Sequence, residues 1–156
     1  MTQNLRDWGF LILRLAMPGM LATFHGWGKF MGAIDYVLRG QEWGFVAFVG
    51  SIGFPIPTFF ALCAALAEFI GCVLLGVGLF TRYAGALVAI TMSVAVFHHL
   101  RTDMGFELAA LYLVISLFFV LAGAGRFSLD RWLNRRSRAE LGSQASSRIR
   151  TAEGQI

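Results

Sequence analysis

Residues 8–29, WGFLILRLAMPGMLATFHGWGK, are mostly apolar, but their few polar residues recur at helical spacing. The segment is long enough to cross a membrane as a helix, which takes about 20 residues. Steps of four, three, four and four residues connect Arg14, Pro18, Leu21, His25 and Lys29. Such steps keep the five residues on one helix face. Because an unpartnered charge inside a bilayer is costly, this face must meet other helices or a cavity.

The apolar segments that follow predict three further spanning helices. With the first, the expected helices cover residues 8–27, 58–80, 83–100 and 104–124. Pro18 and Gly19 are expected to kink the first helix. The small residues around Glu68 in the second segment would allow a close approach of neighbouring helices.

Residues 31–58 are expected to form a loop that is not truly polar. Within it, residues 43–55 are apolar but too short to span, so they suit an interfacial or re-entrant helix that ends at Pro55. The predicted fold is therefore an all-α membrane protein, a four-helix transmembrane bundle with such a helix between helices 1 and 2. The expected domains are a transmembrane unit at 1–126, a short basic amphipathic helix at 127–141 and a disordered tail at 142–156.

Composition supports the membrane assignment. Of 156 residues, 57% are hydrophobic and 14% are charged, whereas about 25% are charged in soluble domains. The net charge of +4 does not indicate nucleic acid, because the arginines gather near the end of the chain and topology explains them. No signal-peptide pattern is evident, so the first apolar segment is expected to remain as a helix.

The basic residues predict the orientation. If both termini are cytoplasmic, the inner side holds Arg6, Arg82, Arg126, Arg131, Arg135, Arg136 and Arg138, and the outer side holds Lys29, Arg39 and Arg101. Cytoplasmic loops carry the excess of Lys and Arg. We therefore expect both termini in the cytoplasm.

This topology gathers titratable residues in the outer half of the bundle. His25, Lys29, His98, His99 and Glu107 would lie at the outer helix ends. Glu68 would lie about 14 Å below the start of its helix, near mid-depth. The arrangement resembles a polar funnel that opens outward.

These titratable residues also have purely structural explanations. Arg14 could equally be the counter-ion of Glu68, Lys29 could extend to the interface, and Glu107 could only cap its helix. His98 and His99 point about 100° apart, so at most one faces the interior. Glu68 is the strongest candidate, since an acid at mid-depth in a bilayer is a functional-site candidate by default.

Metal and thiol chemistry are not predicted. His25, the histidine pair and Glu107 show no metal-ligand spacing within one helix. Cys63 and Cys72 are nine residues apart on opposite faces of one helix, which excludes a disulfide between them. Both cysteines are interpreted as small buried residues.

Several motifs together resemble a known family. The first helix carries Arg14, Phe24-His25-Gly26 and Lys29-Phe30, and the second carries Ala65, Glu68, Gly71, Leu75 and Gly78-Leu79. The fourth opens with GFELAALY at 105–112 and is followed by GAGRFSLDR at 123–131. Residues 10–131 thereby resemble the DoxX family of small bacterial four-helix membrane proteins, although Ala124 stands where the family usually has proline.

The resemblance implies a location in the bacterial inner membrane. The family is named for a subunit of an archaeal thiosulfate:quinone oxidoreductase, and its members are often labelled oxidoreductases. Other relatives associate with membrane redox enzymes, and distant eukaryotic relatives act as assembly factors.

Our first functional hypothesis is a redox-associated subunit that binds a quinone or a similar lipid-soluble molecule in the outer half of the bundle. The candidate binding residues are Arg14, His25, Lys29, Glu68, His98 and Glu107. Glu68 and His25 are the candidate catalytic residues, because carboxyl and imidazole groups can transfer protons near neutral pH. The sequence carries no motif for an electron carrier, so an electron-transferring partner is required.

The alternative is a non-catalytic scaffold or assembly factor for another membrane protein. The polar stripe would then specify the fold, and faces of small residues, Ala67 with Gly71 and Gly85 with Ala89, would contact the partner. A transporter is disfavoured because four helices without an inverted repeat give little room for alternating access. The sequence leaves open whether the protein is an enzyme and whether it forms a homo-oligomer.

Overall fold

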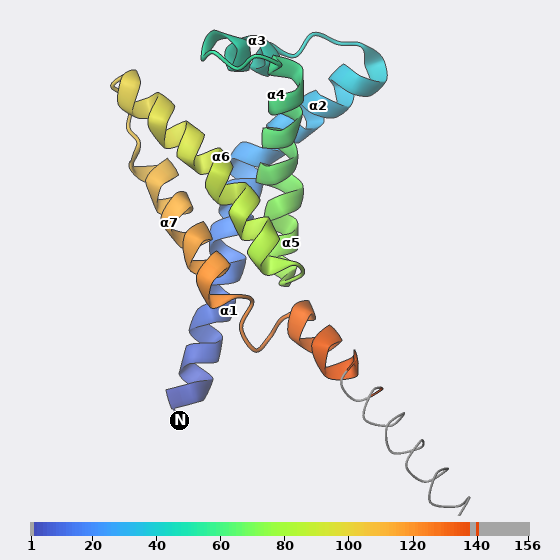
Figure 1. The fold of residues 1–156 in the computed structure, drawn as a ribbon, viewed down its shortest axis with the longest axis vertical. Helices are drawn as coiled ribbons and strands as arrows, with labels where there is room; N and C mark the ends of the chain where they lie inside the picture. The colour runs from blue at the N-terminus through green and yellow to red at the C-terminus, as the bar shows by residue number, and fades with distance from the viewer. Residues whose placement is uncertain (1, 138–139, 141–156) are drawn as a thin grey trace, which may run out of the picture.

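A computed structural model describes residues 2–137 and 140, which form helices and connecting loops without a β-strand. The tail predicted to be disordered, 142–156, lies outside the described residues. Figure 1 shows a bundle of long helices, with the N-terminal end of the chain and the last helix at one end and the short helix α3 at the other.

The first long helix extends well beyond its predicted end. It consists of α1 (Thr2–Leu21), the π-helical turn η1 (Ala22–Gly26) and α2 (Trp27–Arg39), joined through helical backbone at both junctions. Residues 31–39, expected as a loop, are helical, and the helix ends at Gly40, whose φ of 65° suits glycine. The helix runs through Pro18, and its irregular turn is η1.

The second long helix also contains a π-helical turn. It comprises α4 (Pro57–Leu66), η2 (Ala67–Gly71) and α5 (Cys72–Val77), and it ends at Gly78 with φ of 73°. The short apolar helix expected within 43–55 is α3 (Gly44–Ser51), which packs against α4. Pro57 starts α4, a position at which the missing N–H of proline costs nothing.

The last two long helices form an antiparallel pair. α6 (Thr81–Arg101) and α7 (Glu107–Ala122) lie side by side (Figure 1). They approach closely at Gly85, where an added Cβ would lie 3.1 Å from the Ser116 carbonyl oxygen. A further helix covers residues 129–137, within the region predicted to be a basic helix.

The bundle is held by a core that draws on all four long helices. Its buried residues are Met17, Leu21, Ala22, Cys72, Leu75, Ala84, Val88, Met92, Tyr112 and Phe119. Cys72 is buried as expected, but the prediction was wrong for Cys63, which is exposed.

The small residues expected to contact a partner instead pack within this chain. Ala67, Gly71, Gly85 and Ala89 are all buried. Gly71 faces Val88, and Gly85 faces α7. Close helix packing therefore accounts for these residues without a second protein.

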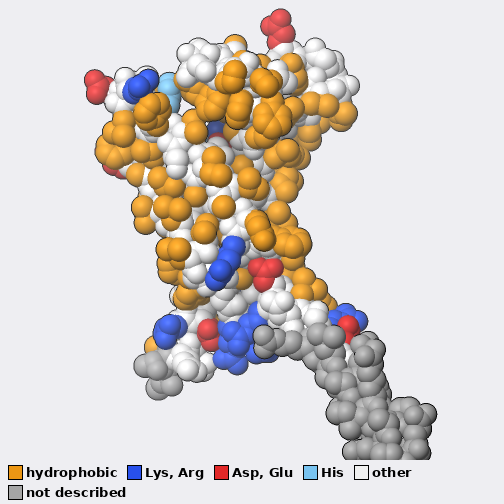
Figure 2. Space-filling model, in the orientation of Figure 1, with side chains coloured by type: hydrophobic (Ala, Val, Ile, Leu, Met, Phe, Trp, Pro, Cys, Tyr) orange, Lys and Arg blue, Asp and Glu red, His pale blue; other side chains and the backbone are white. Residues whose placement is uncertain are grey.

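The outer surface is apolar over the middle of the molecule. Residues 57–77 and 81–101 are long and apolar enough to cross a membrane, and α7 is a shorter apolar helix. Ile12, Ile90 and Leu121 are each more than 60% exposed. Figure 2 shows apolar side chains over the middle and charged ones towards the two ends, as expected for a protein surrounded by lipid.

Candidate functional site

A buried ion pair joins the first and second long helices. The Lys29 ammonium donates hydrogen bonds to both carboxylate oxygens of Glu68, with Nζ–Oε1 and Nζ–Oε2 distances of 2.6 and 2.7 Å. The Glu68 side chain is 3% exposed and that of Lys29 is 30% exposed. The Lys29 Nζ also lies 4.9 Å from the centre of the Phe45 ring, a cation–π contact. Lys29 is thus the main counter-charge of Glu68.

The two π-helical turns bring these helices together. An added Cβ at Gly26 in η1 would lie 2.4 Å from the carbonyl oxygen of Glu68 in η2. Only glycine permits this approach. π-helical turns insert one residue into a helix and occur often at functional sites. Here one turn carries Glu68, and the other lies just before Lys29.

An apolar cavity of about 210 Å³ reaches the ion pair from the side of α3. Residues of α2, α3, α4 and α6 line it, and four aromatic rings contribute to the lining, those of Phe45, Phe48, Phe54 and Phe60. Lys29 and Glu68 contribute its charged groups. The predicted aromatic segment at 43–55 therefore forms part of the wall.

A second cavity, of about 190 Å³, reaches the same ion pair from the side of α7. Lys29, Glu68 and His99 line both cavities. The second is also lined by His25 and Tyr112, whose rings meet edge to face at 6.2 Å. His25 is exposed, so its imidazole is in contact with both the surface and this cavity.

The two adjacent histidines differ in their surroundings. His99 faces the interior, and its Nδ1 is buried without a hydrogen-bond partner among the described residues. His98, a predicted binding residue, lines the first cavity only and packs edge to face on Phe48, with ring centres 5.0 Å apart. Glu107 is exposed at the start of α7 and lines neither cavity.

Arg14 does not meet Glu68, which corrects the expected pairing. Its guanidinium is buried and donates hydrogen bonds to the carbonyl oxygens of Gly76, Ala124 and Phe127. An added Cβ at Gly78 would lie 2.6 Å from its Nη1. Arg14 therefore links α1, the end of α5 and the segment after α7, a structural role at the opposite end of the bundle.

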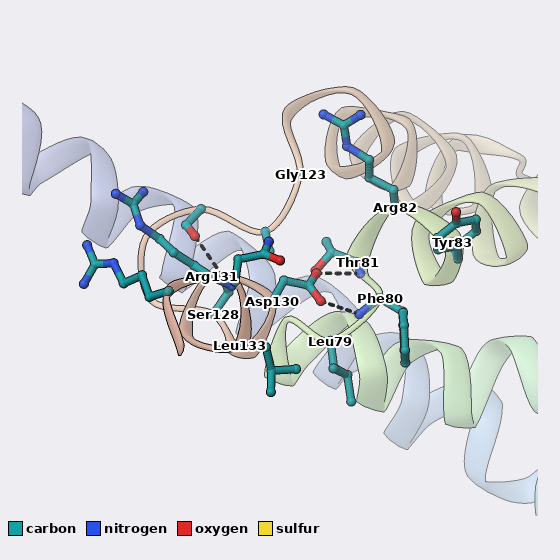
Figure 3. A pocket seen from close by; sticks show the side chains of 14 residues that line it. Leu79, Phe80, Thr81, Arg82, Tyr83, Gly123, Ser128, Asp130, Arg131 and Leu133 are labelled. Atoms are coloured by element: carbon teal, nitrogen blue, oxygen red, sulfur yellow. Dashed lines mark hydrogen bonds between the residues drawn. The ribbon is translucent and has the colours of Figure 1, made fainter. Parts of the chain in front are cut away.

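Asp130, which sequence reasoning did not single out, completes this structural cluster. Its carboxylate accepts hydrogen bonds from the backbone N–H groups of Phe80 and Thr81 and from the Thr81 hydroxyl, at 2.8, 3.0 and 2.8 Å (Figure 3). These contacts cap the N-terminus of α6. Phe80 has φ of 49°, an unusual conformation that the cap helps to hold. The Ser-Leu-Asp-Arg sequence at 128–131 was the only local signal from which a role of Asp130 could have been suspected.

The arrangement around Glu68 combines a carboxylate, an ammonium and an imidazole at the junction of two cavities. An ammonium can donate a hydrogen bond to a ligand oxygen, and a carboxylate or imidazole can give or accept a proton. The aromatic cavity favours a flat, apolar ligand. These features define a helical membrane protein with a buried polar centre beside an apolar cavity.

Comparison with known proteins specifies the family. Residues 9–100 match the model of the DoxX family, so the chain belongs to the DoxX family and the predicted resemblance is confirmed. It is 35% identical over 126 residues to a Bacillus subtilis protein named "Putative oxidoreductase CatD", covering 78% of this chain and 84% of that one. It is 31% identical over 137 residues to an uncharacterized protein of Haemophilus influenzae, covering 82% and 92%. No solved structure matches.

Proposed function

We propose that this protein is a redox-associated subunit of the bacterial inner membrane that binds a quinone, or a similar lipid-soluble ring compound, beside Lys29 and Glu68. The four long helices cross the bilayer, both termini lie in the cytoplasm, and the two cavities lie in the outer half. The excess of arginine at the end that carries the N-terminal part of α1 and helix 129–137 supports this orientation.

The observation that carries the proposal is the aromatic cavity with a doubly hydrogen-bonded ion pair at its inner end. Its volume of about 210 Å³ is below the ~300–1,000 Å³ typical of sites for drug-sized ligands. It therefore suits a single ring, with an apolar tail lying outside among lipid. A ring carbonyl oxygen next to Lys29 Nζ would accept a hydrogen bond from the ammonium.

Reduction of a quinone to a quinol consumes two electrons and two protons. The electrons would come from a partner protein that carries a redox centre. The protons would reach Glu68 through the second cavity, where the imidazoles of His25 and His99 can accept and donate a proton. The name of the Bacillus subtilis relative is consistent with redox chemistry but names no substrate.

Binding of a short-chain ubiquinone to the purified protein, measured by quenching of tryptophan fluorescence, tests the proposal. Phe60→Ala and Phe59→Ala form a matched pair, because Phe60 lines the cavity and its neighbour Phe59 is 55% exposed. We expect Phe60→Ala and Glu68→Gln to weaken binding at least tenfold and Phe59→Ala to leave it unchanged.

Absence of saturable binding to the folded wild type would overturn the proposal. Equal binding by wild type, Phe60→Ala and Glu68→Gln would show that the ligand does not occupy this cavity. Either result would favour the scaffold or assembly factor, and crosslinking in the membrane would then be used to identify the protein that it contacts.

A further inference from the structure

A second site lies at the opposite end of the bundle, where a cavity of about 510 Å³ opens between the start of α1, the end of α7 and helix 129–137. We propose that this cavity binds the phosphate headgroup of an anionic phospholipid. The proposal requires that the bundle stands in a membrane, and it is independent of any ligand beside Glu68.

The cavity is strongly basic. Four arginines from three segments line it, namely Arg6 from α1, Arg126 from the loop after α7, and Arg131 and Arg135 from the last helix. The acidic residue in its wall is Asp7, and its carboxylate lies 3.3 Å from Arg126. Positive charge therefore exceeds negative charge in the cavity wall.

Three of these arginines have no acidic partner in the part of the chain that the structure describes. The ion pairs found there involve Lys29, Arg39, Arg126 and Arg136, and none includes Arg6, Arg131 or Arg135. Arg131 and Arg135 are four residues apart, which places them on one face of their helix. Guanidinium groups brought together in this way favour a phosphate, which accepts paired hydrogen bonds from them.

The surroundings indicate a lipid rather than a soluble anion. Trp8 and Phe127 pack together with ring centres 5.4 Å apart, and Trp8 and Trp132 are both 55% exposed. Tryptophan gathers at the level of the lipid headgroups. Phe10 and Ala122 give the cavity an apolar wall. Basic pockets beside spanning helices on the cytoplasmic side bind anionic headgroups, and Figure 2 shows the blue Lys and Arg side chains gathered at this end.

The test is native mass spectrometry of the delipidated full-length protein in detergent, titrated separately with phosphatidylglycerol and with phosphatidylcholine. Wild type should bind one phosphatidylglycerol at least tenfold more tightly than phosphatidylcholine. The double variant Arg131→Gln/Arg135→Gln should weaken phosphatidylglycerol binding by about 10- to 30-fold, since each basic residue near an anionic surface contributes a factor of about five. Arg136→Gln is the matched control, because Arg136 lies on the same helix outside the cavity.

Arg6→Gln tests the site from a second element and should weaken phosphatidylglycerol binding severalfold. It also keeps the proposal testable if the double variant fails to fold. Wild-type affinity in the folded double variant or in Arg6→Gln would overturn the proposal, as would equal binding of the two lipids. A further titration contains inorganic phosphate at millimolar concentration. If phosphate displaces the lipid, the site binds a soluble anion, and the proposal is overturned.

Discussion

Replacing Lys29 with methionine should destabilise the protein more than any other single change at the ion pair. Methionine keeps much of the length of the side chain but leaves the carboxylate of Glu68, 3% exposed, without its cation. Glu68→Gln leaves Lys29 without its carboxylate. Lys29 is 30% exposed and can still reach water, so we expect the two single changes to differ in cost.

The magnitudes follow from the burial of each partner. Removing one partner of a buried ion pair costs ~3–5 kcal/mol, and partial exposure of Lys29 reduces this to about 2–4 kcal/mol for Lys29→Met. For Glu68→Gln we expect about 1–2 kcal/mol, the cost of a weakened buried hydrogen bond. The double variant has no uncompensated charge and should cost about as much as Glu68→Gln alone. The coupling energy between the two positions then equals the cost of Lys29→Met alone, about 2–4 kcal/mol.

Unfolding in mixed micelles of mild detergent and SDS, followed by far-ultraviolet circular dichroism, measures these free energies. Arg39→Met is the control, because Arg39 is 68% exposed and pairs with Asp35 on the same helix at 3.0 Å, so its loss should cost less than about 0.5 kcal/mol. The reasoning is refuted if the two single changes add to within about 0.5 kcal/mol of the double variant. It is also refuted if Lys29→Met costs no more than Arg39→Met.

Three further changes test the architecture by the same unfolding measurement. Gly26→Ala should destabilise by more than about 2 kcal/mol, because its Cβ would lie 2.4 Å from the Glu68 carbonyl oxygen. Gly28→Ala, with nothing within 4 Å of the added Cβ, should instead stabilise by about 0.5–1 kcal/mol, and equal effects of the two would contradict the packing. Arg14→Leu removes the donor to three carbonyl groups and should cost at least ~3 kcal/mol. In the proposed ubiquinone titration the folded variant should behave like wild type, and a selective loss of binding would give Arg14 a role in that site. Asp130→Ala removes the cap of α6 and should cost about 1–2 kcal/mol, and an unchanged stability would show that the cap is dispensable.

The sequence was sufficient to predict the class of protein and the approximate helix positions. Long apolar segments and low charge are local properties, and the membrane requires them of any spanning helix. The prediction failed at the helix that continues to Arg39, because a single span needs only about 20 residues and the expected helix ended at that length. Its hydrogen bonds within the helix and its packing against α4 decided that part of the structure.

The candidate site was predicted in part. Four of the six candidate binding residues line one or both of two adjoining cavities, namely His25, Lys29, Glu68 and His98. Arg14 and Glu107 line neither cavity, and His99, which was not among the six, lines both. Glu68 is buried as its mid-helix position indicated. The roles of Arg14 and Asp130 were not predictable, since their partners are backbone groups far along the chain. No local pattern identifies a carbonyl or N–H group that another segment will meet.

The sequence by itself determined that the membrane-embedded acid needs a cation, but the tertiary structure decided which cation it meets. On a regular helix, Arg14 and Lys29 share one face. They are fifteen residues apart, so about 22 Å separates them along the helix axis, and only one of them can lie at the depth of Glu68. Packing of Gly26 against the second π-helical turn brings Lys29 to Glu68. Arg14, at the other end of the bundle, instead donates hydrogen bonds to backbone carbonyl groups.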